Sequence, residues 1–325
     1  MLNERVAVAG QDYPGTRSQF LEWFPDEAAC TKYLEQLRWP HGFACAGCGL
    51  MAEPYRASRS RLMCVQCGRQ ASVTAGTIFD KTRTPLMAWF AAAWYIMSQK
   101  HGISALGLQR ILGLGSYQTA WTLMHRLRRA MVRPDRERLR GAVQVDQTYV
   151  ALGDREFSVV PESLGRKRET GKLLVVMAAE MLQPAGIGAI RLRRIPAAAQ
   201  VHVQPFIEAC IDPSALIHTD GSLLYSFLDR HGYQHTRTTL QDVGSRPIAS
   251  SLQRWLLGTR HGAIQPGQLD QYLEEFVFRF NRRGPPSRGM LFYRLLEQAI
   301  QSAPITYRDI VDSRPVAVPI QDEWS

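Results

Sequence analysis

The sequence predicts a multidomain protein with a zinc ribbon, a helical segment and an α/β domain, in that order. Two CxxC pairs predict the ribbon, a helix-turn-helix-like pattern follows, and alternating strand and helix patterns begin near residue 140. The expected boundaries are 18–80 for the ribbon with its leading helix, 81–138 for the helical segment, 140–300 for the α/β domain and 301–325 for a peripheral tail. A length of 325 residues is sufficient for two or three such domains.

The composition favours a polyanionic partner. The chain has 39 Lys and Arg residues against 29 Asp and Glu residues, which gives a net charge of +10. Such an excess is typical of nucleic-acid-binding proteins, although many basic proteins only have a solvated cationic surface. No apolar run is long enough for a membrane span, and the first residues lack a secretory signal pattern. We therefore expect a cytoplasmic protein with no membrane partner.

Four cysteines predict a structural zinc site. They form two CxxC pairs with 15 residues between the pairs: Cys45, Cys48, Cys64 and Cys67. Each CxxC turn can present two thiolates to one ion, and four thiolates satisfy the tetrahedral preference of zinc. Two disulfides or buried free thiols are the alternatives, and iron is a lesser one because the ligands alone do not exclude it. Cys30 and Cys210 are isolated, and we expect them to be packing residues.

Helical patterns precede and follow the ribbon. Residues 18–37 predict one leading helix, residues 70–78 a short closing strand, and residues 85–99 another helix. Residues 102–131 have the layout of a helix, a glycine-bearing turn and a second helix capped by Ser116. This layout resembles a DNA-binding helix-turn-helix, and an ordinary helical hairpin is the alternative. The arginines of the second helix that we expect to contact phosphates are Arg126, Arg128 and Arg129.

From residue 141 onward, strand and helix patterns alternate. The predicted strands are 143–150, 172–179, 187–195, 215–219 and 234–240. The predicted helices are 200–211, 223–231, 248–257 and 267–280. Three strands are followed by a helix, a strand, a helix, a strand and a helix. This is the order of the ribonuclease H fold, a mixed sheet whose carboxylates gather at one edge.

Two aspartates lie on strands that are neighbours in that fold. Asp146 is in the middle of the first predicted strand, and Asp220 ends the fourth. A carboxylate at the centre of a strand is costly to bury unless it binds a cation or a partner. A facing pair could hold magnesium or manganese, and two such ions stabilise the attacking and leaving oxygens of a displacement at phosphorus. The alternative is a structural role, which is stronger for Asp220 because Gly221 makes it a turn residue.

Longer segments resemble one known family. They are FACAGCG, LMCVQCGRQASVTAGTIFDKTRTP, VQVDQTYV, HTDGSLLYSFLDRHGYQH, QRWLLGTRHGAI and YLEEFVFRFNRR. They are similar to the zinc-ribbon DDE transposases of bacterial insertion sequences, the ISXO-like group, and the similarity covers residues 18–300. The resemblance implies an N-terminal region that recognises the inverted repeats of the element and a ribonuclease H-like domain that cuts and joins DNA. It also carries the first two catalytic acids of the family onto Asp146 and Asp220.

The sequence departs from the family pattern near the expected third acid. Gln147 replaces the glutamate that usually follows the first aspartate. The third metal ligand should lie near the start of the helix after the fifth strand, yet no carboxylate lies between Asp242 and Asp270. Asp242 from the loop and Glu275 from the later helix are the two candidates for the third acid. His261 is a candidate polar partner in the same cleft.

Basic side chains are expected to line a channel beside the acids and to contact phosphates. They are Arg254, Arg260, Arg279, Arg282 and Arg283. Trp255 is expected to be a core residue, because Leu252 and Leu256 share its helical spacing, and stacking on a base is the alternative. Glu274 is expected on a solvated helix face.

The leading hypothesis is therefore a transposase that hydrolyses a phosphodiester at the element end and joins the freed 3′ hydroxyl to target DNA. Its implied cofactors are structural zinc and catalytic magnesium or manganese. Its implied partner is double-stranded DNA, bound by a homodimer because two ends must be held together, in the bacterial cytoplasm and at the nucleoid. The alternative is a decayed or repurposed transposase that only binds DNA, which the missing third acid favours. A nuclease acting on RNA–DNA hybrids fits less well, because it needs no sequence-specific N-terminal module.

Overall fold

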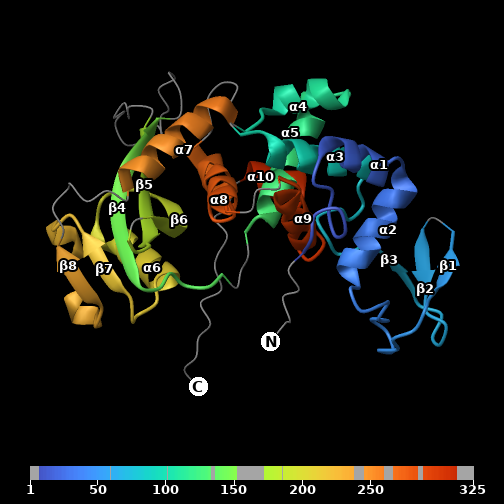
Figure 1. Ribbon diagram of the computed structural model, residues 1–325, viewed down its shortest axis with the longest axis horizontal. Coiled ribbons are helices and arrows are strands. Elements are labelled where there is room, and N and C mark those ends of the chain that lie inside the picture. The colour runs from blue at the N-terminus through green and yellow to red at the C-terminus, as the bar shows by residue number, and fades with distance from the viewer. Residues whose placement is uncertain are drawn as a thin grey trace, which may run out of the picture. The chain divides into compact units, whose positions relative to one another are not determined.

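The computed structural model describes nine stretches of the chain. They are residues 7–58, 60–100, 102–132, 136–151, 172–184, 186–237, 245–259, 266–284 and 288–312. The chain divides into two compact units (Figure 1). Met1–Val132 and Pro285–Val311 form the first unit, and Arg133–Gly284 with Asp312–Ser325 forms the second. Among the described residues, no helix has the length and apolar character that crossing a membrane requires.

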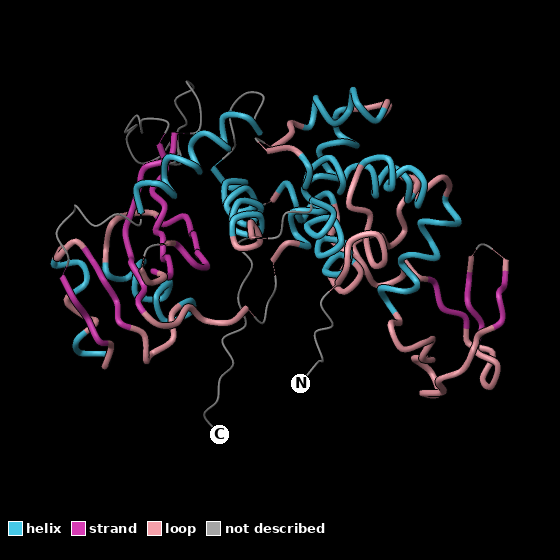
Figure 2. The backbone as a smooth tube through the Cα atoms, in the orientation of Figure 1, coloured by secondary structure: helices cyan, strands magenta, loops and turns pink. Residues whose placement is uncertain are grey.

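The first unit contains a helical body and a small three-stranded sheet (Figure 2). Its helices are α1 (Arg17–Trp23), α2 (Glu27–Arg38), α3 (Leu86–Ser98), α4 (Ala105–Leu112), α5 (Tyr117–Ala130), α9 (Arg288–Ala299) and α10 (Tyr307–Val311). The single helix predicted over residues 18–37 is wrong, because α1 ends before Pro25 and α2 begins after it. Asp26 caps the new helix by accepting a hydrogen bond from the amide of Ala29 at 2.8 Å.

An aromatic cluster holds the helical body together. Phe292 of α9 is fully buried, and its ring lies 5.6 Å from Phe20, 5.9 Å from Phe90 and 5.6 Å from Trp94, measured between ring centroids. Helix α9 therefore packs with the N-terminal helices, although its sequence lies within the range 140–300 that we assigned to the α/β domain.

The predicted helix, turn and second helix between residues 102 and 131 are present as α4 and α5. Gly113 ends α4 with a positive φ of 62°, which favours glycine. Ser116 caps α5 as predicted, because its hydroxyl accepts a hydrogen bond from the amide of Thr119 at 3.0 Å.

The ribbon sheet consists of β1 (Tyr55–Ala57), β2 (Arg61–Met63) and β3 (Gln70–Ser72), all antiparallel. The closing strand predicted over residues 70–78 is shorter, because the chain turns after Ser72. Arg38 anchors this turn to the end of α2, since its guanidinium donates to the carbonyls of Val73 at 2.6 Å and Ala75 at 2.8 Å.

The second unit is built on a mixed five-stranded sheet with the order β6-β5-β4-β7-β8. The strands are β4 (Ala142–Ala151), β5 (Lys172–Met181), β6 (Ile187–Ile195), β7 (Leu216–Thr219) and β8 (Gln234–Arg237). The first three pair antiparallel, whereas β7 pairs parallel with both β4 and β8. The five strands agree with the sequence prediction, and residues 238–240, the last of the range predicted for β8, lie outside the described residues. The helix expected at 223–231 consists instead of two short 3₁₀ turns, Leu223–Tyr225 and Asp229–His231.

Helices cover both faces of this sheet (Figure 1). On one face, α6 (Gln200–Cys210) packs on residues such as Val143 and Val145. On the other face, α7 (Ser245–Thr259) and α8 (Leu269–Phe280) pack on residues such as Val150 and Met177. Neighbouring residues of a strand point to opposite faces.

The segment after α8 closes the edge strand of the sheet. The side-chain amide of Asn281 accepts from the N–H of Ile190 at 2.8 Å and donates to its carbonyl at 3.1 Å. Arg283 donates to the carbonyls of Gly188 and Ile187 on the same strand. An open edge strand invites pairing with another chain, so these side chains replace the missing neighbour of β6.

We predict that Asn281→Ala destabilises the second unit by about 1–3 kcal/mol, because it leaves two backbone groups of β6 without their partner. Urea unfolding followed by circular dichroism measures this loss. Asn281→Asp keeps the acceptor and loses the donor, so we expect an intermediate loss. Wild-type stability in both variants would show that Asn281 does not hold the edge.

Candidate functional site

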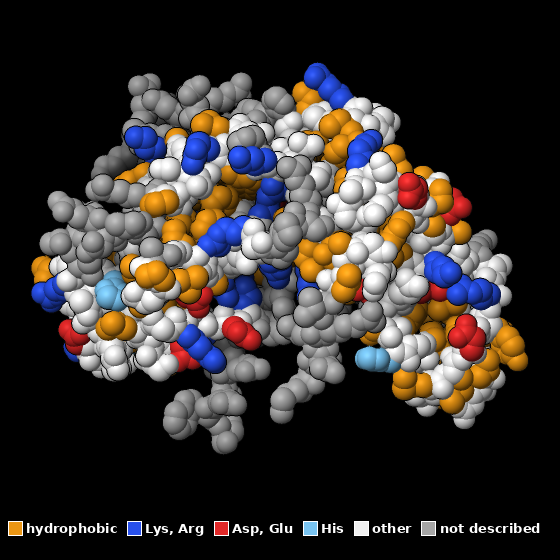
Figure 3. Space-filling model, viewed as in Figure 1, with side chains coloured by type: hydrophobic (Ala, Val, Ile, Leu, Met, Phe, Trp, Pro, Cys, Tyr) orange, Lys and Arg blue, Asp and Glu red, His pale blue; other side chains and the backbone are white. Residues whose placement is uncertain are grey.

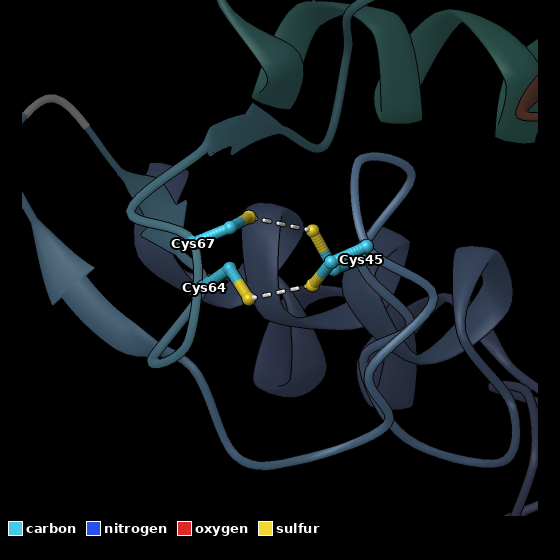
Figure 4. A group of neighbouring side chains, drawn as sticks. Cys45, Cys64 and Cys67 are labelled. Atoms are coloured by element: carbon cyan, nitrogen blue, oxygen red, sulfur yellow. Dashed lines mark hydrogen bonds between the residues drawn. The ribbon is translucent and has the colours of Figure 1, made fainter.

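The four predicted zinc ligands lie together. The Sγ atoms of Cys45, Cys48, Cys64 and Cys67 all fall within 4.8 Å of one another. Figure 4 shows Cys45 facing Cys67, with 3.5 Å between their sulfurs, and the sulfurs of Cys48 and Cys64 are 3.6 Å apart. These distances are far longer than a disulfide bond of about 2.05 Å, and all six cysteines of the chain are free thiols. Among the described residues, no other group of three or more His, Cys, Asp or Glu side chains is as close.

The two CxxC turns have the same backbone geometry. In the first, the N–H of Cys45 donates to the carbonyl of Leu50 and the N–H of Gly49 donates to the carbonyl of Cys45, each at 2.9 Å. In the second, Cys64 pairs with Arg69 at 2.9 Å and Gly68 with Cys64 at 3.0 Å in the same pattern. Both glycines have positive φ, 74° and 68°, a conformation that other residues adopt only with strain. The two CxxC turns thus have the same backbone geometry and direct their sulfurs toward one point.

This arrangement fits a zinc ion. Four sulfurs at about 2.3 Å from a tetrahedral ion would be about 3.8 Å apart, close to the observed separations. Backbone N–H groups of Cys48 and Gly47 bond to the sulfur of Cys45 and lower its pKa to about 6. Those of Cys67 and Gln66 lower the pKa of Cys64 in the same way. Stabilised thiolates are the form in which cysteine binds metal.

The two isolated cysteines are packing residues, as predicted. Cys30 is fully buried in α2, and burial raises the pKa of its thiol to about 12. Cys210 is the last residue of α6 and packs against the core of the second unit, and burial raises its pKa as well. Neither thiol is close enough to the ribbon cysteines to join their group.

Asp146 lies on β4, and Asp220 directly follows the neighbouring strand β7. Gln144 of β4 pairs with His218 of β7 in parallel register, and β7 ends at Thr219. Continuing this register by two residues brings Asp146 and Asp220 to the same level of the sheet. Asp146 pairs across the sheet with Met177, so it lies on the face covered by α7 and α8.

Backbone amides orient both carboxylates. The N–H of Gln147 donates to Asp146 Oδ1 at 2.7 Å, and the N–H of Ser222 donates to Asp220 Oδ1 at 3.0 Å. Gly221 has a φ of 79°, which lets the chain turn directly after Asp220. Asp146 is half-buried and Asp220 is exposed.

The residue after Asp146 belongs to the opposite face. The side-chain amide of Gln147 donates to the hydroxyl of Tyr225 at 3.0 Å, and Tyr225 is almost completely buried. Burial raises the pKa of Tyr225, and the nearby negative charges of Asp220 and Asp146 raise it further. Sequence reasoning missed Tyr225, although its position five residues after Asp220 in HTDGSLLY was a usable signal.

The structure does not bring a third acid to this pair among the described residues. Asp242 lies outside them. Glu275 is fully buried in α8, 3.8 Å from Arg279 in an ion pair, and α8 packs against β6 at the far edge of the sheet. Helix α7, which packs against β4, has no Asp or Glu in its sequence SRPIASSLQRWLLGT.

Several of the arginines predicted to contact phosphates have partners within the chain. Arg128 is only 2% exposed, with its guanidinium 3.4 Å from the ring of His125, so a phosphate contact does not fit it. Arg282 lies over the ring of Phe278 at 4.1 Å, and Arg283 is occupied by β6. Arg126 and Arg129 are half-buried, and Arg254 is exposed. Arg260 and His261 lie outside the described residues.

Two other predictions on α7 and α8 have clear outcomes. Trp255 is 5% exposed and packs against Tyr272 and Phe276, which confirms its core role. The solvated face expected for Glu274 is wrong, because its carboxylate binds Arg136 through two hydrogen bonds of 2.6 and 2.8 Å. Sequence reasoning missed Arg136 as its partner, since 138 residues separate the two.

We expect the wild-type chain to bind one zinc ion and Cys45→Ser to lose it, together with the fold of the ribbon. Metal analysis and circular dichroism measure both effects. Cys210→Ser is the matched control, because it removes a thiol of the same chain that lies outside the group. Full zinc content in Cys45→Ser would contradict the four-cysteine site.

Comparisons with known proteins give matches both to the N-terminal ribbon and to the α/β region of the second unit. Residues 138–281 match the family model of the ISXO2-like transposase domain, and residues 25–70 match that of the transposase zinc-ribbon domain. A relative described as an uncharacterized protein in transposable element ISH50 of Halobacterium salinarum is 27% identical over 282 residues, which cover 80% of this chain and 92% of the relative. The chain thus has one region similar to the transposase zinc ribbon and another similar to the ISXO2-like transposase domain, which is the resemblance that its motifs predicted.

Proposed function

We propose that this transposase cuts and joins DNA at the ends of its insertion sequence, using Asp146 and Asp220 to hold divalent metal ions. The observation that carries the proposal is the parallel register of β4 and β7, whose last pair, Gln144 with His218, lies two residues before Asp146 and Asp220. Two carboxylates on adjacent strands can share metal ions, and magnesium or manganese would activate a nucleophile and neutralise charge on phosphate oxygens.

The sheet supports a ribonuclease H-like assignment. Its strand order, with three antiparallel strands followed by two parallel ones, is the one that the sequence led us to expect for that fold. We assign the catalytic domain to the second unit, because both acids and the region that matches the transposase domain fall within it. The ribbon and α4–α5 would then form the DNA-binding part.

The described residues prepare the acid pair for this role. The amides of Gln147 and Ser222 each fix one carboxylate oxygen, which orients the side chain before any ion arrives. The bond from Gln147 to Tyr225 ties the middle of β4, next to Asp146, to the turn after Asp220. Preorganised ligands of this kind lose little freedom when they bind an ion.

The surface and the proposed assembly also fit DNA. On the face shown in Figure 3, Lys and Arg side chains are spread more widely than Asp and Glu. The net charge of +10 would attract a phosphate backbone and release its counterions. We further propose that a homodimer acts on DNA, because a single chain offers one acid pair and an element has two ends.

A second candidate function is DNA binding without cleavage. Helix α7 packs on the face that carries Asp146 but has no carboxylate, and this favours a transposase that has lost its third metal ligand. Such a protein would keep the ribbon and bind the terminal repeats without cutting them.

Strand cleavage of a labelled terminal-repeat duplex with magnesium or manganese separates the two functions. We expect the wild-type chain to cleave and Asp146→Asn to lose at least about 100-fold in rate, because the amide cannot hold the ions. Glu208→Gln is the matched control, since it neutralises an exposed carboxylate on α6, which covers the opposite face. Binding without cleavage in the wild-type chain would favour the second function, and equal cleavage by Asp146→Asn would contradict the proposed acid pair.

DNA affinity should fall steeply with salt. We expect at least about a tenfold loss in binding constant between 50 and 200 mM salt, because several phosphates are neutralised at once. Fluorescence anisotropy with a labelled duplex measures the slope. A flat response would contradict binding through a basic surface.

A further inference from the structure

The ribbon sheet has one face toward its own core and one toward solvent. Leu62 of β2 is buried with the metal-site cysteines, and Arg56 and Ala71 are its cross-strand partners on that inner face. Tyr55, Met63 and Gln70 are paired with one another on the opposite face, where Arg61 pairs with Ala57 and Ser72. We call this second set the outer face of the ribbon.

The two arginines of the sheet have different partners. Arg56 binds the carboxylate of Glu35 in α2 through two hydrogen bonds of 2.9 and 3.2 Å, so its charge is used inside the unit. Arg61 donates instead to the neutral side-chain carbonyl of Gln70 at 3.1 Å. Its charge is therefore not balanced by that contact, while its guanidinium is held in a defined direction.

Arg61 and Gln70 are side-chain types that read base edges. A guanidinium pairs with the two acceptors of guanine, and a carboxamide pairs with the donor and acceptor of adenine. Both residues are exposed, and they lie on neighbouring strands of a narrow sheet. The major groove of DNA admits two adjacent strands, and Arg61 and Gln70 lie on the adjacent strands β2 and β3.

The rest of the outer face is compatible with DNA. Tyr55 is 61% exposed beside Met63, a large aromatic surface for a strand of only three residues. None of the nine residues in β1, β2 and β3 is acidic, so the face has no carboxylate of its own to repel phosphate. A polyanion thus fits this surface better than a basic protein partner would.

We propose that the outer face of the ribbon lies in the major groove of the terminal repeat, where Arg61 and Gln70 contact bases and Tyr55 packs beside them. This inference rests on the proposed function, because it names the surface with which the transposase recognises its element. Arg61 and Gln70 would then recognise the sequence of the repeat, and neither residue lies in α5.

Binding of two duplexes tests the assignment: one with the inverted repeat that flanks this reading frame, and one with the same bases in scrambled order. The variants are Arg61→Ala, Arg61→Lys and Gln70→Ala in the full chain. Arg69→Ala is the matched control, because Arg69 is an exposed arginine of the same ribbon that lies beside Gly47 rather than on the sheet. Zinc content of each variant confirms that the ribbon is folded.

We expect Arg61→Ala to lose about 10- to 100-fold in affinity for the repeat and much less for the scrambled duplex. Arg61→Lys should keep the scrambled affinity and lose part of the preference, because lysine cannot form two parallel bonds. Arg69→Ala should weaken both duplexes equally, if at all.

Two results would overturn the inference. A wild-type chain that prefers the repeat, with Arg61→Ala and Gln70→Ala keeping the full preference, would place recognition elsewhere and leave the proposed function intact. A wild-type chain without any preference for the repeat would contradict the proposed function as well.

Discussion

The parallel pairing of β4 with β7 is the constraint on which the candidate acid pair depends. It extends over only three residue pairs, and the central one joins Val143 to Ile217, both fully buried beneath α6. A shift of one residue would turn these side chains out of the core, so burial fixes the register. The same alternation places Asp146 on the opposite face. Core packing on one side of the sheet thus determines where the carboxylate lies on the other.

Patterns that depend on local sequence were predictable, and features that depend on distant partners were not. The strands, the CxxC turns and the Ser116 cap follow from periodicity, spacing and side-chain chemistry. Helix α9 has an ordinary amphipathic sequence, and only its burial of Phe292 among N-terminal aromatic rings shows which unit it joins. The partner of Glu274 could not be predicted for the same reason, because Arg136 is brought near it by the fold alone.

Net charge was a poor guide to which arginines face a ligand. Arg128, Arg283 and Arg38 satisfy buried or backbone groups, and burial lowers the pKa of Arg38 and Arg283. Long side chains with five donors are suited to such anchoring. An arginine that can contact DNA is therefore distinguished by an exposed side chain and by a guanidinium whose partner in the chain is not a carboxylate. By that criterion Arg61 differs from Arg56, although both lie in the same small sheet.

The absence of a third acid beside the pair, among the residues that the structure describes, has a physical consequence that does not require complete loss of activity. The residues of α7 that face the sheet are apolar, among them Ile248, Leu252 and Trp255, so this helix supplies no oxygen ligand next to Asp146. Magnesium readily keeps waters in place of protein oxygens, but each lost carboxylate removes charge that attracts the ion. A pair of aspartates alone would bind metal more weakly than a set of three. Whether such a transposase is active would then depend on the metal concentration and on whether phosphate oxygens complete the metal site. The fold of the sheet would not decide it.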